Sequence, residues 1–275
     1  MDTFNGGNPT GQENLDRQLR GEYQVDVFGY INQALALYRQ EFLKFIGYVL
    51  VLFLAYLVSQ SPLLLLLPES IDWLGWSYVF DSYPIVALIV VISGIFYLML
   101  IPLYSGMSIV AYKMMSGYKV RFADFFRGYK YVKPLVVFSL AQGVIFFIVY
   151  FVFASVSVLV LLLTVVFPFE RSTEFVLVLM TLLSLVTMLY FLVSFIFSPL
   201  LIIDRRMEYW QAMEMSRKVV MKNWFSIFWL LVVLAFFNMI GSSVMWLGLP
   251  VTIPLSALTL AVAYREIFGL AGSDW

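Results

Sequence analysis

The chain alternates long uncharged apolar runs with short segments in which charged residues gather. A helix needs about 20 mostly apolar residues to cross the hydrocarbon core of a bilayer, and six runs reach or approach that length. The spans that this pattern predicts are residues 42–60, 84–112, 135–167, 175–203, 224–246 and 249–267. We therefore expect an all-α integral membrane domain over residues 22–269, between a polar tail at 1–21 and a short tail at 270–275.

Amphipathic segments precede the first, third and fifth spans, and each is predicted to lie as a helix in the membrane interface. The first carries an apolar stripe of Val25, Phe28, Ile31, Leu35, Tyr38, Phe42 and Phe45. The second, at 119–133, places Phe122, Phe125, Phe126 and Tyr129 on one helical side, and Pro134 is expected to end it. The third, at 204–222, does the same with Tyr209, Ala212, Met213, Ser216 and Val220. The fold is thus predicted to be three two-span hairpins, each preceded by an interfacial helix.

A repeated sequence supports this three-part division. The stretches 101–117 and 253–269 align without a gap and share Ile-Pro-Leu, Val-Ala-Tyr and a final glycine. A fainter copy at 198–209 keeps the ten-residue spacing from proline to tyrosine. The three copies indicate one membrane unit used repeatedly, each with a proline in its second span: Pro102, Pro199 and Pro254.

The distribution of cations predicts the orientation of the spans. Of the 17 Lys and Arg residues, every one except Arg171 falls on one side of the predicted membrane domain. Because cytoplasmic connections carry the excess of Lys and Arg, we expect both termini in the cytoplasm. The first forty residues contain no apolar signal-peptide core, so we also expect the N-terminus to be retained.

Composition excludes several classes of chemistry. Hydrophobic residues make up 62% of the chain and charged residues 12%, and cysteine and histidine are both absent. Thiolate and histidine metal sites, haem ligation by histidine and histidine bases are therefore excluded, and we predict no metal or other cofactor. The net charge of zero indicates no nucleic-acid partner. Since the spans hold no charged residue away from their ends, a proton pump or charged ion pore is not expected, and neither is an enzyme.

Two sets of residues remain as candidate sites, each with two interpretations. Pro102, Pro199 and Pro254 either kink their helices, which we favour, or mark the broken helices of a binding site. Glycines 94, 106 and 143 are expected where helices approach closely.

The cations near the third interfacial segment either contact anionic lipid headgroups or only fix the topology. These candidate lipid contacts are Arg205, Arg206, Lys218 and Lys222.

The last third of the chain resembles a broad family of uncharacterised bacterial six-span membrane proteins. The family is similar to the membrane region associated with glycerophosphodiester phosphodiesterases. The matching pattern is a Pro-Leu exit, an Asp-Arg pair, an A-x-x-x-S helix and a Lys-Asn-Trp entry. Here these positions are Pro199, Leu200, Asp204, Arg205, Ala212, Ser216, Lys222, Asn223 and Trp224. The resemblance implies a bacterial inner-membrane protein, and the phosphodiesterase chemistry is not implied because the soluble catalytic domain is absent from this chain.

Two functions stay open from the sequence. The favoured one is a non-enzymatic accessory or scaffold subunit of a membrane complex, or an envelope-maintenance protein, with partners reached through residues 1–21 or the interfacial helices. The alternative is a transporter or lipid-handling protein for an uncharged or amphiphilic substrate. A lipid-sized cavity beside Pro102, Pro199 and Pro254 would support the alternative, and a packed centre would weaken it.

Overall fold

The computed structural model describes residues 23–64, 83–166, 170–243 and 248–270, and these residues fold into helices without any strand. Most of both predicted tails lies outside the described residues. Six apolar helices occur: α3 (Phe42–Leu64), α6 (Tyr83–Met115), α7 (Val132–Val166), α8 (Glu170–Ser194), α11 (Trp224–Ser243) and α12 (Leu249–Phe268). Six helical regions of the described chain are long and apolar enough to cross a membrane, which confirms the all-helical class and the number of candidate spans.

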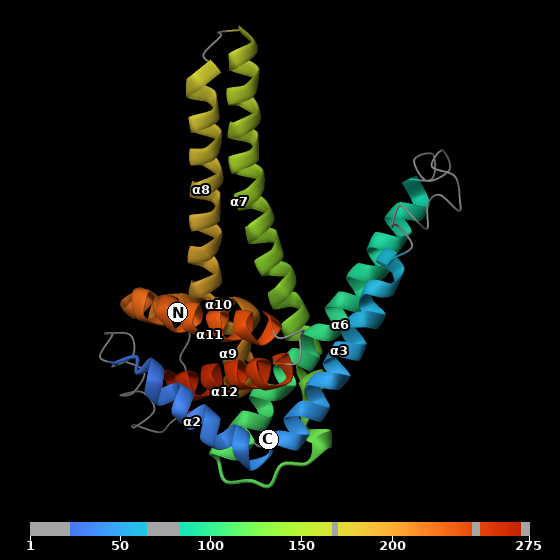
Figure 1. Cartoon of the computed structure of the whole chain (residues 1–275), viewed down its shortest axis with the longest axis vertical. Coiled ribbons are helices and arrows are strands. Elements are labelled where there is room, and N and C mark those ends of the chain that lie inside the picture. The colour runs from blue at the N-terminus through green and yellow to red at the C-terminus, as the bar shows by residue number, and fades with distance from the viewer. Residues whose placement is uncertain (1–22, 65–82, 167–169, 244–247, 271–275) are drawn as a thin grey trace.

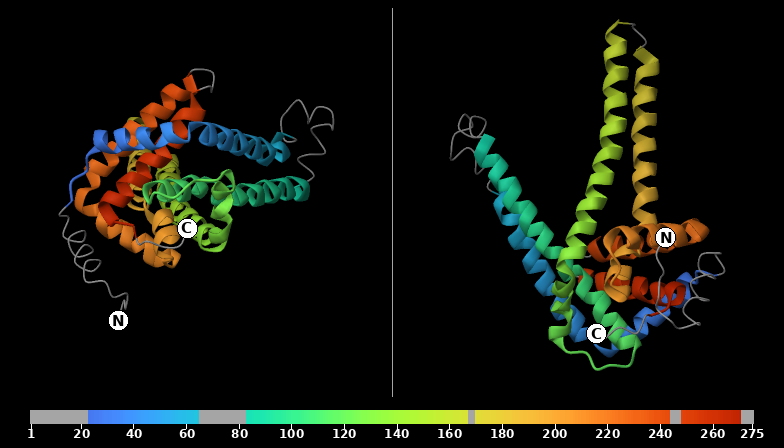
Figure 2. Two further views of the ribbon diagram at one scale, coloured as in Figure 1. Left: turned by 90° about the horizontal axis from the view of Figure 1, so that it is seen from below. Right: turned by 180° about the vertical axis from the view of Figure 1, so that it is seen from behind.

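Shorter helices connect these six. They are α2 (Val27–Gln40), η1 (Phe122–Tyr131), α9 (Ser198–Arg205), α10 (Tyr209–Val220) and η2 (Met221–Asn223). Helix α3 lies alongside α6, and α7 lies alongside α8 (Figure 1). The two pairs diverge from a common base, where α2, α9, α10, α11 and α12 gather (Figure 2). This base contains the best-buried part of the described chain.

Large aromatic side chains fill the base. Tyr48, Tyr112, Phe125, Phe197 and Tyr264 are all fully buried there. The outer parts of α7 and α8 bury almost none of their apolar side chains against the described chain. Contiguous apolar surface of this extent is not stable in water, because each exposed apolar side chain forgoes the gain of burial. These two helices therefore require an apolar surrounding.

The helix α2 turns a different face inward from the one predicted. Asp26 caps its start by accepting a hydrogen bond at Oδ1 from the backbone N–H of Gly29, at 2.9 Å. Tyr30, Ala34 and Tyr38 are its buried residues, and they face α12 rather than open space. Phe28 of the predicted stripe is 73% exposed. Two surfaces of α2 are thus apolar: one, with Tyr38 of the predicted stripe, packs on α12, and the other, with Phe28, is left uncovered by the described residues.

The second amphipathic segment is not an α-helix. Residues 122–131 form a 3-10 helix of ten residues, η1, and the α-helix α7 begins directly after it at Val132. Pro134 lies in the first turn of α7, where its missing N–H has no intrahelical acceptor to lose. The expected stop at Pro134 is therefore wrong, since η1 ends earlier, at Tyr131, and the proline lies within the helix that follows.

The predicted fourth span is divided in two. Helix α8 ends at Ser194, three residues form a turn, and α9 begins at Ser198 with Pro199 in its first turn. Helix α9 ends at Arg205, and the next residue, Arg206, has a φ of 52°. The third amphipathic segment then follows as α10, whose buried residues include Ala212, Met213 and Ser216 of the predicted face.

Candidate functional site

The three repeated segments meet in the base of the molecule. Tyr112 of α6 and Tyr264 of α12 occupy equivalent positions of the repeat, and their ring centroids lie 5.7 Å apart. The hydroxyl of Tyr264 donates a hydrogen bond to Oδ2 of Asp204 at 2.8 Å, and Asp204 belongs to the third copy, near the end of α9. All three residues are buried. The repeat thus contributes one polar side chain from each copy to a single buried cluster.

Arg205 closes this cluster at the end of α12. Its Nη2 donates a hydrogen bond to the carbonyl oxygen of Phe268 at 2.6 Å. A cation at this place is favourable because the last carbonyl groups of a helix have no intrahelical donor. Arg205 therefore links α9 to α12. It is partly buried, whereas the sequence suggested a side chain that faces lipid headgroups.

A cavity of about 360 Å³ lies next to this cluster, between α6, α7, α9 and α12. Its volume falls within the roughly 300–1,000 Å³ of small-molecule sites. The walls are mainly apolar, and no lining residue is charged. Representative lining residues are Ile101 and Tyr104 of α6, Phe138 of α7, Ile203 of α9, and Ala257 and Leu260 of α12. The few polar atoms include the hydroxyl groups of Ser105, Ser108 and Ser139.

One repeat proline lines the cavity, and the residues just before the other two line it as well. Pro199 lines it directly, while Ile101 and Ile253 line it immediately before Pro102 and Pro254 in the chain. Helices α6 and α12 continue through their prolines, and Pro199 instead begins α9. A proline inside a helix leaves the carbonyl group four residues earlier without its donor, which permits local irregularity. The prolines therefore belong to the part of the fold that surrounds the cavity.

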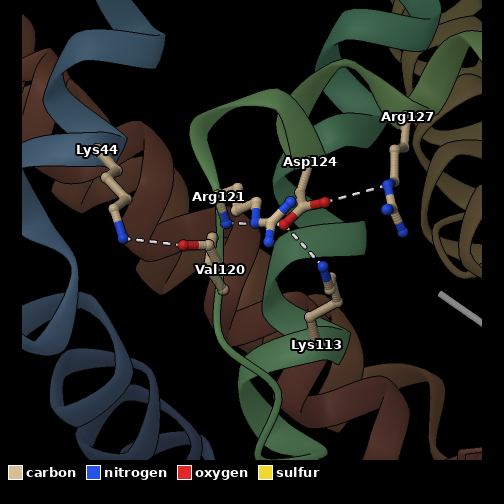
Figure 3. A network of polar contacts seen from close by, with 6 residues as sticks. All are labelled: Lys44, Lys113, Val120, Arg121, Asp124 and Arg127. Atoms are coloured by element: carbon tan, nitrogen blue, oxygen red, sulfur yellow. Dashed lines mark hydrogen bonds and ion pairs between the residues drawn. The ribbon is translucent and has the colours of Figure 1, made fainter.

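The η1 helix is fixed against the α6 wall by a buried ionic network (Figure 3). Asp124 is only 2% exposed, and its Oδ2 lies 2.7 Å from Nζ of Lys113. The same oxygen accepts the backbone N–H of Arg121 at 2.7 Å, and Oδ1 lies 3.0 Å from Nε of Arg127. A buried carboxylate is tolerated only with such partners. Sequence reasoning missed this pair, because eleven positions separate Lys113 from Asp124 across a turn.

Two glycines let η1 approach α6 at backbone distance. A Cβ on Gly106 would overlap the carbonyl oxygen of Phe125, and one on Gly128 would overlap that of Pro102. Tyr48 adds hydrogen bonds from its hydroxyl to the carbonyl oxygens of Leu103, at 2.7 Å, and Phe125. The expected close approach is confirmed at Gly106. It is wrong at glycines 94 and 143, where no described atom lies within 4 Å of an added Cβ.

The predicted lipid contacts do not form one cluster of free cations. Lys218 pairs with Glu214 at 2.7 Å, as their four-residue spacing on α10 favours. Arg206 and Lys222 are exposed, and Arg205 is tied to α12. The structure thus leaves two of the four side chains unpaired among the described residues.

The entry into α11 binds the chain's first described residues. Asn223 donates from Nδ2 to the carbonyl oxygen of Tyr23 at 3.0 Å. The hydroxyl of Tyr23 in turn donates to the carbonyl oxygen of Val219 at 2.8 Å. Burial raises the pKa of Tyr23 to about 12, against the opposing effect of the hydrogen bond with Asn223. The hydroxyl therefore stays protonated and keeps donating at neutral pH.

No group of three or more acidic side chains that could hold a metal ion occurs among the described residues. Neither a protein-family model, nor a curated protein, nor a solved structure matches the chain. The cavity and its surroundings therefore have to be interpreted from their own chemistry.

Proposed function

We propose that the chain is an inner-membrane protein that binds a single-chain amphiphile or an uncharged apolar molecule in the cavity between α6, α7, α9 and α12. The observation that carries the proposal is that this apolar cavity is lined by Pro199 and by Ile101 and Ile253, which directly precede Pro102 and Pro254 in the chain. Of the two functions left open by the sequence, only lipid or amphiphile handling requires such a space.

The chemistry of the walls defines the ligand class. Isoleucine, leucine, methionine and phenylalanine side chains favour an alkyl chain, and the absence of a charged lining residue disfavours an ionic group inside. The hydroxyl groups of Ser105, Ser108 and Ser139 can orient one polar group of the ligand. The volume is near the lower end for ligand sites, so one chain fits the cavity better than a complete two-chain lipid.

The proposal includes the membrane orientation. The six apolar helices are three hairpins, α3–α6, α7–α8 and α11–α12, and α2, η1 and α10 lie at the cytoplasmic interface. The support is the one-sided distribution of Lys and Arg, which is the main determinant of orientation. Pro102 and Pro199 then lie toward the cytoplasmic ends of their spans, whereas Pro254, near the start of α12, lies toward the opposite side of the membrane. No step of covalent chemistry is part of this function.

A second candidate function is the accessory or scaffold subunit that the sequence favoured. One observation favours it: α7 and α8 expose apolar side chains along their length, among them Phe147, Phe151 and Val186. Another membrane protein can pack on such a surface, as can lipid chains. Residues 1–21, the other predicted contact with partners, lie outside the described residues.

Photochemical cross-linking tests the cavity proposal. The purified full chain is incubated with an alkyl amphiphile carrying a diazirine near the chain end, irradiated, and mapped by peptide mass spectrometry. We expect labelled peptides from α6, α9 and α12, at positions around Tyr104, Pro199 and Ala257. In Ala257→Trp the indole fills the cavity, so labelling at α6 and α9 should fall at least tenfold.

The matched control is Ala87→Trp, which adds the same side chain at an exposed position of α6. It should label like the wild type. Labelling spread evenly over the exposed faces of α7 and α8, and unchanged in Ala257→Trp, would mean that the cavity takes no ligand.

A further inference from the structure

The unusual geometry of η1 arranges its side chains in three rows. A 3-10 helix has three residues per turn, so side chains three apart are eclipsed, and such helices seldom exceed three or four residues. Here the 3-10 conformation continues for ten residues, from Phe122 to Tyr131. Each row therefore has its own composition. In an α-helix, with 3.6 residues per turn, residues three apart would not line up in such rows.

One row fixes the helix to the protein. Phe122, Phe125, Gly128 and Tyr131 follow each other at intervals of three, and all except Phe122 are buried. Phe125 stacks on Tyr48 with ring centroids 4.5 Å apart, and Gly128 touches the backbone of α6. The orientation of η1 is thus determined by packing, and so is the direction in which the other two rows point.

The second row is cationic on its outer side. It consists of Arg121, Asp124, Arg127 and Lys130, and Lys133 continues the interval of three into α7. Its single carboxylate, Asp124, is turned inward to Lys113 (Figure 3). Arg121, Lys130 and Lys133 are exposed and form no ion pair among the described residues. The carboxylate of Asp124 is therefore buried and does not neutralise the exposed cations of this row.

The third row is aromatic and apolar. Phe126, Tyr129 and Val132 are 37%, 44% and 39% exposed. The hydroxyl of Tyr129 donates to the carbonyl oxygen of Met99 at 3.3 Å, so this ring is held in place. Aromatic rings of this kind favour the level of the headgroups in a bilayer.

We propose that these two outer rows of η1 form a binding surface for anionic lipid headgroups of the leaflet in which η1 lies. The cationic row contacts the headgroups, and the aromatic row lies at the boundary with the acyl chains. This surface lies outside the cavity and does not depend on the cavity's function. It also differs from the contacts predicted on α10, where Glu214 neutralises Lys218. The complementary charge and the paired apolar row together favour a lipid surface over a soluble anion.

Lipid binding to the purified full chain in a neutral detergent tests this inference. Phosphatidylglycerol and phosphatidylcholine are titrated separately, and bound lipids are counted by native mass spectrometry. In the triple variant Arg121→Gln, Lys130→Gln, Lys133→Gln, we expect phosphatidylglycerol binding to weaken roughly fivefold for each cation removed. Binding of phosphatidylcholine should not change. The control is Arg206→Gln, Lys218→Gln, Lys222→Gln, which removes the same charge near α10 and should have the smaller effect.

Equal losses in the two triple variants would overturn the inference, because net charge alone would then explain binding. Unchanged phosphatidylglycerol binding in the η1 variant would overturn it as well. If that variant does not fold, the single substitution Lys130→Gln serves instead. It should weaken phosphatidylglycerol binding roughly fivefold, and Lys130→Arg should leave it unchanged. Equal binding in these two single variants would also contradict the proposed surface.

Discussion

Gly106 and Gly128 determine how closely η1 approaches the α6 wall of the cavity. Both stand where a neighbouring carbonyl oxygen occupies the space of a Cβ, and backbone cannot move aside as a flexible side chain can. The close contact between η1 and α6 therefore requires residues without a side chain at both positions. Tyr48 then fastens it through hydrogen bonds to both elements.

Substitution of either glycine should weaken this contact. We expect Gly106→Ala and Gly128→Ala each to lower the free energy of unfolding by about 1–3 kcal/mol, as overpacking does elsewhere. The controls are Gly94→Ala and Gly143→Ala, which meet open space and should be neutral or slightly stabilising, since alanine favours a helix. The measurement is the thermal unfolding midpoint in detergent. A common shift in all four variants would show that helix propensity, and not contact, sets the result.

At the residue scale, the sequence predicts which side chains are charged but not which charges are paired. The spacing of Glu214 and Lys218 by four residues on a helix indicates their pairing directly. Lys113 and Asp124 belong to different elements, and only the folded turn between α6 and η1 brings them together. The same limit explains the glycines. Gly106 has a partner across the turn and Gly94 has none, although both lie in the same helix.

At the scale of elements, amphipathic periodicity located α2, η1 and α10 but misjudged the conformation of η1, and α9 was predicted only as the end of a longer span. An α-helical period places Phe125, Phe126 and Tyr129 together, whereas the 3-10 helix buries Phe125 and exposes the other two. The reason is tertiary. The carbonyl oxygens of Pro102 and Phe125 and the ion pair of Asp124 select the tighter helix, and no local pattern in 119–133 contains them.

The proposed orientation of the helices is testable because the chain contains no cysteine. Single cysteines at Lys119 and Lys222 should react with a membrane-impermeant maleimide only from the cytoplasmic side of sealed membrane vesicles. A cysteine at Glu174, at the start of α8, should react only from the opposite side. Reaction of all three positions from the same side would contradict the hairpin arrangement.

At the scale of the whole molecule, the repeat predicted that three segments are equivalent, and the structure adds that they meet. Tyr112, Asp204 and Tyr264 come from different copies and share one buried cluster. The cavity is lined by residues of all three copies, from α6, α9 and α12. A repeat detected in a sequence gives no distance between its copies. The sequence could therefore say that a cavity near the prolines would favour lipid handling, but it could not predict that such a cavity exists.

The divergence of the helix pairs also belongs to this scale. Helices α7 and α8 contact each other along their length and contact the base only at one end (Figure 1). Hydropathy predicted an apolar helix at each of these places, although α8 ends earlier than expected, and it cannot show that the pair stands apart from α3 and α6. Packing of spans depends on which small and polar residues face each other, and α7 offers Gly143 to no described neighbour.

The most direct test of the central claim is the mass of the intact particle. The full chain is extracted in a gentle detergent and measured by native mass spectrometry, beside Ala257→Trp and the control Ala87→Trp. We predict the chain with one tightly bound amphiphile in the wild type and in Ala87→Trp, and the chain alone in Ala257→Trp. A particle with a stoichiometric protein partner and no amphiphile in all three would contradict the cavity proposal and favour the scaffold function.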